Sequence, residues 1–134
     1  FPQVIVPLEV ESEIISNPFP DVDELKLALS RFIVLKELSD PDQRLRAYLD
    51  IGESAVIEVA RKLRIPRAIL DDRVARKVAR RVHGIQVKGT FGILVEAKQN
   101  GLVSRVRPML DEMKRHHYRM SNRLYAACLT LAGE

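Results

Sequence analysis

The sequence predicts an α/β fold in which helices cover both faces of a parallel sheet. Short apolar runs without polar alternation recur along the chain, as in strands that are buried on both faces. Amphipathic segments with helical period lie between these runs, so strands and helices alternate. The 134 residues contain no repeat and no linker-like stretch, and this length suits one domain, 1–134, with a sizeable core.

Four apolar runs are predicted to be strands. They are 3–6, which Pro7 ends, 32–38, 67–71 and 85–89. Two stretches rich in Pro and Asp, 17–21 and 39–43, predict a loop and a turn. The strands are therefore expected to be short and to be joined by helical segments.

Seven segments are predicted to be helices. They are 7–15, 21–32, 52–63, 73–83, 90–100, 106–116 and 122–133. Pro7 suits the first position of a helix, and Gly84 and Gly101 are predicted to stop two of the others. Thr90 and Ser121 are predicted N-caps, because their hydroxyls can accept a bond from the first helical turn.

The composition is that of a basic soluble protein. Apolar residues make up 46% of the chain, charged residues 30%, and the net charge of +4 favours an anionic partner. Aromatic residues make up only 5% and Trp is absent, which argues against a broad stacking platform for bases. The lone Cys128 excludes an intramolecular disulfide and favours a reducing compartment, the cytoplasm. With no membrane-length apolar run and no signal peptide, no membrane partner is expected.

Adjacent carboxylates follow the third predicted strand. Asp71 and Asp72 stand at its carboxyl end, where parallel sheets place their sites. One interpretation is that Asp72 caps the next helix and that Asp71 is merely polar. The other is that the pair forms half of a metal site. The two aspartates alone do not separate these interpretations.

Further carboxylates follow other strands. Glu53 falls in the first turn of the 52–63 helix, at the edge of its apolar arc, where either the helix N-terminus or a cation would stabilise it. In the first helix, the helical wheel places Glu11 nearest the apolar residues and Glu13 to one side. Converging carboxylates repel one another unless a cation neutralises them, and Mg²⁺ or Mn²⁺ suits all-oxygen ligation. The pattern is therefore compatible with a metal-dependent phosphodiesterase.

The 73–83 helix is strongly basic. The wheel predicts an inner arc of Val74, Ala75, Val78, Ala79 and Val82. It predicts an outer face of Arg73, Arg76, Lys77, Arg80 and Arg81. This face is either an ordinary solvated surface or a surface that contacts nucleic-acid phosphates.

Several stretches together resemble the PIN-domain (PilT N-terminus) family. The stretches are "VIVPLEVESEI", "LDIGESAVIEVARKL", "ILDDRVARKV", "IQVKGTFGILVEAKQNGLV" and "LAGE". The chain is most similar to a short prokaryotic branch of predicted nucleic-acid-binding proteins, relatives of VapC-type toxins. The resemblance implies a three-layer α/β/α sandwich around a central parallel sheet. It also implies an Mg²⁺- or Mn²⁺-dependent ribonuclease, with RNA as substrate and with an antitoxin protein and a second copy of the chain as partners.

The resemblance also implies site residues. It matches Glu13, rather than Glu11, to the acid on the helix after the family's second strand. It matches Glu53 to the second acid and Asp71, with Asp72 beside it, to the third. Thr90 matches a small polar residue near the metal, an alternative to its role as N-cap. These four acids are the implied catalytic residues, and Arg73, Arg76, Lys77 and Arg80 are the predicted nucleic-acid contacts.

One part of the family pattern has no counterpart here. PIN proteins open with a strand that carries an Asp, often as D-x-S, and the present sequence begins where their second strand begins. We therefore expect that strand upstream of Phe1 or from a partner. Two alternatives to the ribonuclease stay open: a non-catalytic PIN-like module that binds nucleic acid or protein, and a hydrolase of small phosphate esters.

Overall fold

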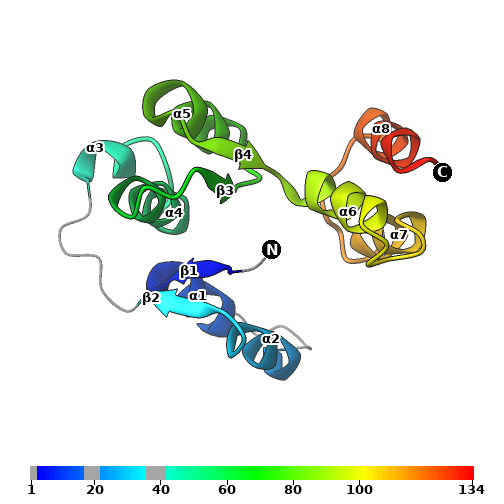
Figure 1. The fold of residues 1–134 in the computed structure, drawn as a ribbon, viewed down its shortest axis with the longest axis horizontal. Helices are drawn as coiled ribbons and strands as arrows, with labels where there is room; N and C mark the ends of the chain where they lie inside the picture. Colours follow the sequence, from blue (N-terminus) through cyan, green and yellow to red (C-terminus); the bar gives the residue numbers. More distant parts are fainter. Residues whose placement is uncertain (1–2, 17–21, 36–41) are drawn as a thin grey trace. The chain divides into compact units, whose positions relative to one another are not determined.

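The computed structural model describes residues 3–16, 22–35 and 42–134. They belong to two compact units, Phe1–Val87 and Lys88–Glu134 (Figure 1). The predicted loop at 17–21, the end of the second predicted strand and most of the predicted turn at 39–43 fall outside the described residues. No helix in the described ranges is both long enough and apolar enough to cross a membrane.

The first unit opens with a parallel pair of strands joined by two helices. The elements are β1 (Ile5–Pro7), α1 (Leu8–Ser16), α2 (Val22–Leu29) and β2 (Ile33–Leu35). The register places Ile5 opposite Ile33 and Val6 opposite Val34. These elements confirm the first two predicted strands and the helices between them. However, Pro7, predicted as the first residue of the helix, is the last residue of β1, and α1 begins at Leu8.

The same unit continues with three helices and a second pair of strands. The elements are α3 (Gln43–Arg46), α4 (Ile51–Lys62), β3 (Arg67–Ile69), α5 (Arg73–His83) and β4 (Gln86–Lys88). Strand β3 pairs with β4 in a sheet of its own. Gly84 ends α5 as predicted, with a φ of 64° that a glycine adopts without strain. The mixed α/β class is thus confirmed, although the four described strands form two separate pairs.

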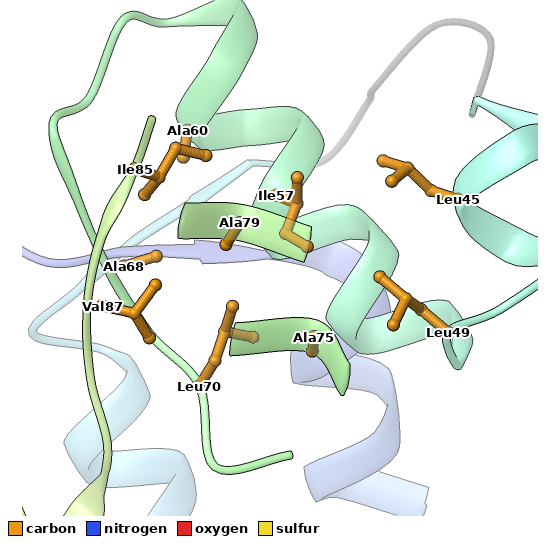
Figure 2. Close-up of a cluster of buried hydrophobic side chains, with 10 residues drawn as sticks. All are labelled: Leu45, Leu49, Ile57, Ala60, Ala68, Leu70, Ala75, Ala79, Ile85 and Val87. Carbon is orange, nitrogen blue, oxygen red and sulfur yellow. The ribbon is translucent and has the colours of Figure 1, made fainter. Parts of the chain in front are cut away.

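The core of this unit lies between α4, α5 and the β3–β4 pair. Ten buried side chains meet there (Figure 2): Leu45, Leu49, Ile57, Ala60, Ala68, Leu70, Ala75, Ala79, Ile85 and Val87. Ile57 of α4 is fully buried, as are Ala75 and Ala79 of α5. Alanine at these two α5 positions lets the helix backbone approach the core closely, because no larger side chain holds it away.

Burial on the two amphipathic helices differs from the wheel predictions. Val74 and Val82 of α5 are 48% and 69% exposed, so the predicted inner arc is narrower than expected. For the 52–63 segment the helical wheel predicts Leu63 in the buried arc and Glu58 outward. Leu63, the C-cap of α4, is 49% exposed, whereas Glu58 is only 1% exposed. The wheel assumes one buried face, but α4 packs against α1, α3, α5, β1 and β3, so more of its surface is covered. The carboxylate of Glu58 accepts a hydrogen bond from the backbone N–H of Asp42.

The second unit is helical. It contains α6 (Thr90–Gln99), α7 (Arg107–Arg115) and α8 (Asn122–Ala132). Its buried core consists of Val106, Leu110, Cys128, Leu129 and Ala132. Ser121 caps α8 as predicted, with Oγ accepting from Leu124 N at 3.1 Å. Helical periodicity predicts a core stripe of Leu124, Ala127, Cys128 and Leu131 on α8. This prediction was partly wrong, because Leu124 and Leu131 are 41% and 68% exposed.

Glu134 connects three helices of this second unit. Its carboxylate accepts from Lys98 Nζ at 2.8 Å, from Val106 N at 2.6 Å and from Arg107 N at 3.1 Å. The side-chain bond from Lys98 and the backbone bond from Val106 lower the pKa of Glu134 to about 2. The carboxylate thus ties the end of α8 to α6 and to the first turn of α7.

Candidate functional site

Carboxylates from separate elements meet at the first turn of α4. A Cβ added to Gly52 would lie 3.2 Å from Glu13 Oε2 and 3.4 Å from Val10 Cγ2. Gly52 therefore leaves the space in which the α1 carboxylate lies against α4. Glu13, and not Glu11, is the α1 acid at this position, and its role as a site acid stays a prediction.

The electrostatics of Glu53 support the same grouping. Partial burial raises the pKa of Glu53 first, and the negative charges of Asp50 and Asp72 raise it further. Glu13 adds a smaller contribution of the same sign, while the hydrogen bond from Asp50 N lowers the pKa. Carboxylates from α1, from the start of α4 and from the start of α5 therefore act on one another here.

Glu53 also has a local structural role. Asp50 is the N-cap of α4, and its Oδ1 accepts from Glu53 N at 2.7 Å. In return Glu53 Oε2 accepts from Asp50 N at 3.4 Å, which completes a capping box. Asp50 was not predicted as a cap, although the D-x-x-E spacing over 50–53 is the signature of this motif.

Asp72 is the N-cap of α5, as one of the two interpretations predicted. Its Oδ1 accepts from Val74 N at 2.6 Å and from Ala75 N at 2.9 Å. These backbone bonds, that from Ala75 foremost, lower the pKa of Asp72. The neighbouring Asp71 is exposed and directly precedes this cap. A capping carboxylate has a second oxygen, so the cap does not prevent Asp72 from contributing its charge to the group around Glu53.

The carboxylates fit a hard divalent cation by their chemistry. All of their donors are oxygens, which Mg²⁺ and Mn²⁺ prefer. However, within residues 3–16, 22–35 and 42–134 no three His, Cys, Asp or Glu residues are arranged so that they could hold a metal ion. The described residues thus bring Glu13, Glu53 and Asp72 near one another without completing a coordination sphere.

The predicted ligand Thr90 belongs to the second unit, so its part in the site stays a prediction. Its predicted role as N-cap of α6 was wrong. The N-cap is Gly89, which makes no side-chain cap bond, and Thr90 is the first residue of the helix. The backbone turns into the helix one residue earlier than the sequence indicated.

The cations of α5 have different environments. Arg73, Lys77 and Arg81 are exposed, while Arg76 is half-buried and its charge helps to lower the pKa of Asp72. Arg80 donates from Nη2 to the carbonyl oxygen of Val87 at 2.8 Å, so it also holds α5 to the end of β4. Arg73 and Lys77 are therefore the predicted phosphate contacts best suited to a test.

The comparison with family models identifies the family of the chain. A family model described as a PIN domain matches residues 1–134. The comparisons with curated proteins and with solved structures found no match. Because the family match covers both units, the chain belongs to the PIN-domain family.

Proposed function

We propose that this chain forms the scaffold of an Mg²⁺- or Mn²⁺-dependent endoribonuclease that hydrolyses phosphodiester bonds. PIN domains are generally nucleases. The observation that carries the proposal is the position of Glu13, whose Oε2 lies 3.2 Å from where a Cβ on Gly52 would be, so that an α1 carboxylate lies beside the first turn of α4, which contains Glu53. Burial, and then the charges of Asp50, Asp72 and Glu13, raise the pKa of Glu53. Like charges held together in this way favour a site that a cation completes.

Each residue has a proposed role. Glu13, Glu53 and Asp71 would hold the cation, with Asp72 beside them and Thr90 as a weaker candidate. When bound, such an ion lowers the pKa of a water molecule and stabilises charge on the phosphoryl oxygens. Arg73, Arg76 and Lys77 would hold flanking phosphates of the RNA, and Arg80 would add charge while it fixes α5 to β4.

The proposal includes one further strand. Helix α4 packs against both β1 and β3, yet these two strands belong to different pairs. A strand supplied from outside the described residues, either upstream or by a partner, would join the pairs into one parallel sheet. It would complete the α/β/α sandwich, make 1–134 part of one domain, and add the Asp that the family pattern expects.

The biological setting that we propose follows the sequence resemblance. The similarity to VapC-type toxins favours a prokaryotic, cytoplasmic toxin whose activity an antitoxin protein restrains, and a homodimer as the assembled form. Isolation of the intact protein with a co-encoded partner that blocks its cleavage would support this setting. Full ribonuclease activity that no co-encoded partner inhibits would contradict it.

RNA cleavage with matched variants tests the activity. The protein, including any upstream residues, should cleave single-stranded RNA with Mg²⁺ or Mn²⁺ and stop when EDTA is added. Asp71→Asn should reduce the rate at least about 100-fold, since one ligand of the site is lost. Asp23→Asn is the control, because Asp23 lies on α2 with a side chain that is 95% exposed. Equal cleavage by the Asp71 variant would refute the proposal, as would turnover of small phosphomonoesters alone.

A second candidate function is a binding module that keeps the scaffold without the chemistry. It is favoured by the lack of a metal-holding group among the described residues. In that case Arg73→Glu with Lys77→Glu should abolish RNA binding, and Mg²⁺ should change neither binding nor the RNA itself. Metal-dependent cleavage by the wild-type protein would exclude this candidate.

A further inference from the structure

The net positive charge is unevenly divided between the two units. Residues 88–134 contain eight Lys or Arg and four Asp or Glu. Residues 1–87 contain fourteen of each, the basic helix α5 included. The entire net charge of +4 therefore resides in the second unit, and not in the unit with the most conspicuous run of cations.

Ion pairs show where the surplus of the second unit lies. Lys88, just before α6, pairs with Glu96 at 2.6 Å, and Lys98, within α6, pairs with Glu134 at 2.8 Å. Each of these two positive charges therefore has a negative partner. Arg115 pairs with Glu112 on α7. Arg119 and Arg123 form no ion pair within the part of the chain that the structure describes. The surplus therefore falls on Arg105, which precedes α7, and on α7, the start of α8 and the segment between them.

Two helices that are fixed to each other, together with the segment between them, present the cations of this region. Tyr125 of α8 donates its hydroxyl to Asp111 Oδ1 at 2.7 Å. Lys114 Nζ lies 4.0 Å from the centroid of the Tyr125 ring, a cation–π contact. These contacts join α7 to the first turn of α8. We call the exposed residues Arg107, Lys114, Arg119 and Arg123 the α7–α8 basic surface.

The spacing of these cations indicates an extended ligand. Arg107 and Lys114 are two turns apart, which is roughly 10 Å along α7. Arg119 and Arg123 extend the charge across the connection to the first turn of α8. A single phosphate can touch only one end of such a surface, whereas a chain of phosphates can contact several of its cations together.

We propose that the α7–α8 basic surface binds the phosphate backbone of single-stranded RNA, as a second contact outside the acidic site. The inference rests on the proposed function, because it makes this surface part of substrate binding. The second unit then supplies the long-range attraction, since only this unit has a net positive charge. The first unit supplies the carboxylates.

Binding to RNA without catalysis tests the proposal. Fluorescence anisotropy would follow a labelled single-stranded RNA in EDTA over a series of salt concentrations. Arg119→Glu with Arg123→Glu should weaken binding at least about tenfold and reduce the slope of log K against log salt by about 1.4, the value for two phosphates. The control, Lys26→Glu with Arg31→Glu, makes the same change in net charge on exposed side chains of the first unit.

The outcomes are distinct. An unchanged affinity and salt slope in the Arg119/Arg123 variant would overturn the proposal, as would an equal loss in the control. Binding to vesicles containing phosphatidylserine with no binding to RNA would also overturn it and would indicate a membrane surface instead. If Asp71→Asn binds RNA normally and the wild-type protein does not cleave it, the catalytic proposal fails while this one stands. Unchanged melting temperatures would show that both double variants are folded.

Discussion

Glu53 of the first unit and Glu134 of the second have opposite environments. In the first unit, burial and the charges of Asp50, Asp72 and Glu13 raise the pKa of Glu53. In the second unit, Lys98 and two backbone N–H groups lower the pKa of Glu134 to about 2. A carboxylate that is satisfied by donors stabilises the fold, whereas one that is surrounded by other acids gains most from a cation. Glu134 is therefore interpreted as a structural acid and Glu53 as a candidate site acid.

The charge balance follows the same division. The first unit is neutral in total and contains the carboxylate group, while the second has the net positive charge. A nuclease that acts on a polyanion needs both features, since acids alone would repel the substrate.

The largest expected effect on stability is at the core of the first unit. Ile57→Ala removes a fully buried side chain and should lower the free energy of unfolding by about 2–5 kcal/mol. Leu110→Ala makes the equivalent change in the second unit. Chemical denaturation should show whether each variant destabilises only its own unit. Ile51→Ala, at a side chain that is 57% exposed, should change stability by less than about 0.5 kcal/mol. A similar loss in all three variants would contradict the core assignment.

Glu134→Gln should lower the melting temperature by several degrees at neutral pH, because the charged acceptor of three hydrogen bonds is lost. The folded pKa of about 2 lies below the ordinary value of 4.5, so the stabilisation is fully present above pH 4.5. It is lost as the pH falls from 4.5 toward 2. Thermal melts of both proteins across this range should converge at low pH. A constant difference would show that the charge of Glu134 is not what stabilises the unit.

The helix cap at Asp72 should have a smaller effect. Asp72→Ala removes the acceptor for Val74 N and Ala75 N and should cost about 0.5–2 kcal/mol. Asp72→Asn keeps an acceptor oxygen and should restore most of this stability. If Asp72 also contributes to the cation site, Mn²⁺ affinity measured by calorimetry should fall in both variants. Normal Mn²⁺ affinity in the Asn variant would limit Asp72 to its role as a cap.

Local rules predicted most of the elements. Ser121 and Gly84 were identified correctly because a cap depends on residues within one turn of the helix end. The short helix α3 was missed, since four residues are too few to show a period. The burial of Glu58 was also missed, because it depends on how many neighbours surround α4 and not on the sequence of α4.

The candidate site was predictable only in part. The ordered motifs indicated Glu13 and Glu53, and the structure brings both to the first turn of α4. Periodicity alone favoured Glu11, because a wheel describes one helix and contains no information on the space that Gly52 leaves beside it. The α7–α8 basic surface has no sequence motif, since its cations come from two helices, which Tyr125 joins, and from the segment between them.

Glu53→Gln should have the opposite effect on stability to Glu134→Gln. Glutamine can still accept from Asp50 N in the capping box, and it removes a charge that Asp50, Asp72 and Glu13 repel. The raised pKa means that ionised Glu53 destabilises the fold as the pH rises above its ordinary value of 4.5. The melting temperature should therefore be unchanged or slightly higher at pH 7, with the difference vanishing near pH 4. A large decrease would show that Glu53 is mainly a structural residue.

The smallest change in stability is expected at Gly52. Alanine suits a helix better than glycine by about 1 kcal/mol, but its Cβ would lie 3.2 Å from Glu13 Oε2 and would push that carboxylate aside. The two effects should nearly cancel in the melting temperature. Mn²⁺ affinity and RNA cleavage should nevertheless fall, because Glu13 would be displaced from the group around Glu53.

Gly101→Ala is not a matched control, since the φ of 71° at Gly101 strains any other residue. Gly92→Ala serves better, because its Cβ would meet only Lys88 side-chain carbons at 3.9 Å. Loss of Mn²⁺ affinity in the Gly52 variant and not in the Gly92 variant would tie metal binding to the position of one α1 carboxylate. Equal affinities would place Glu13 outside the site.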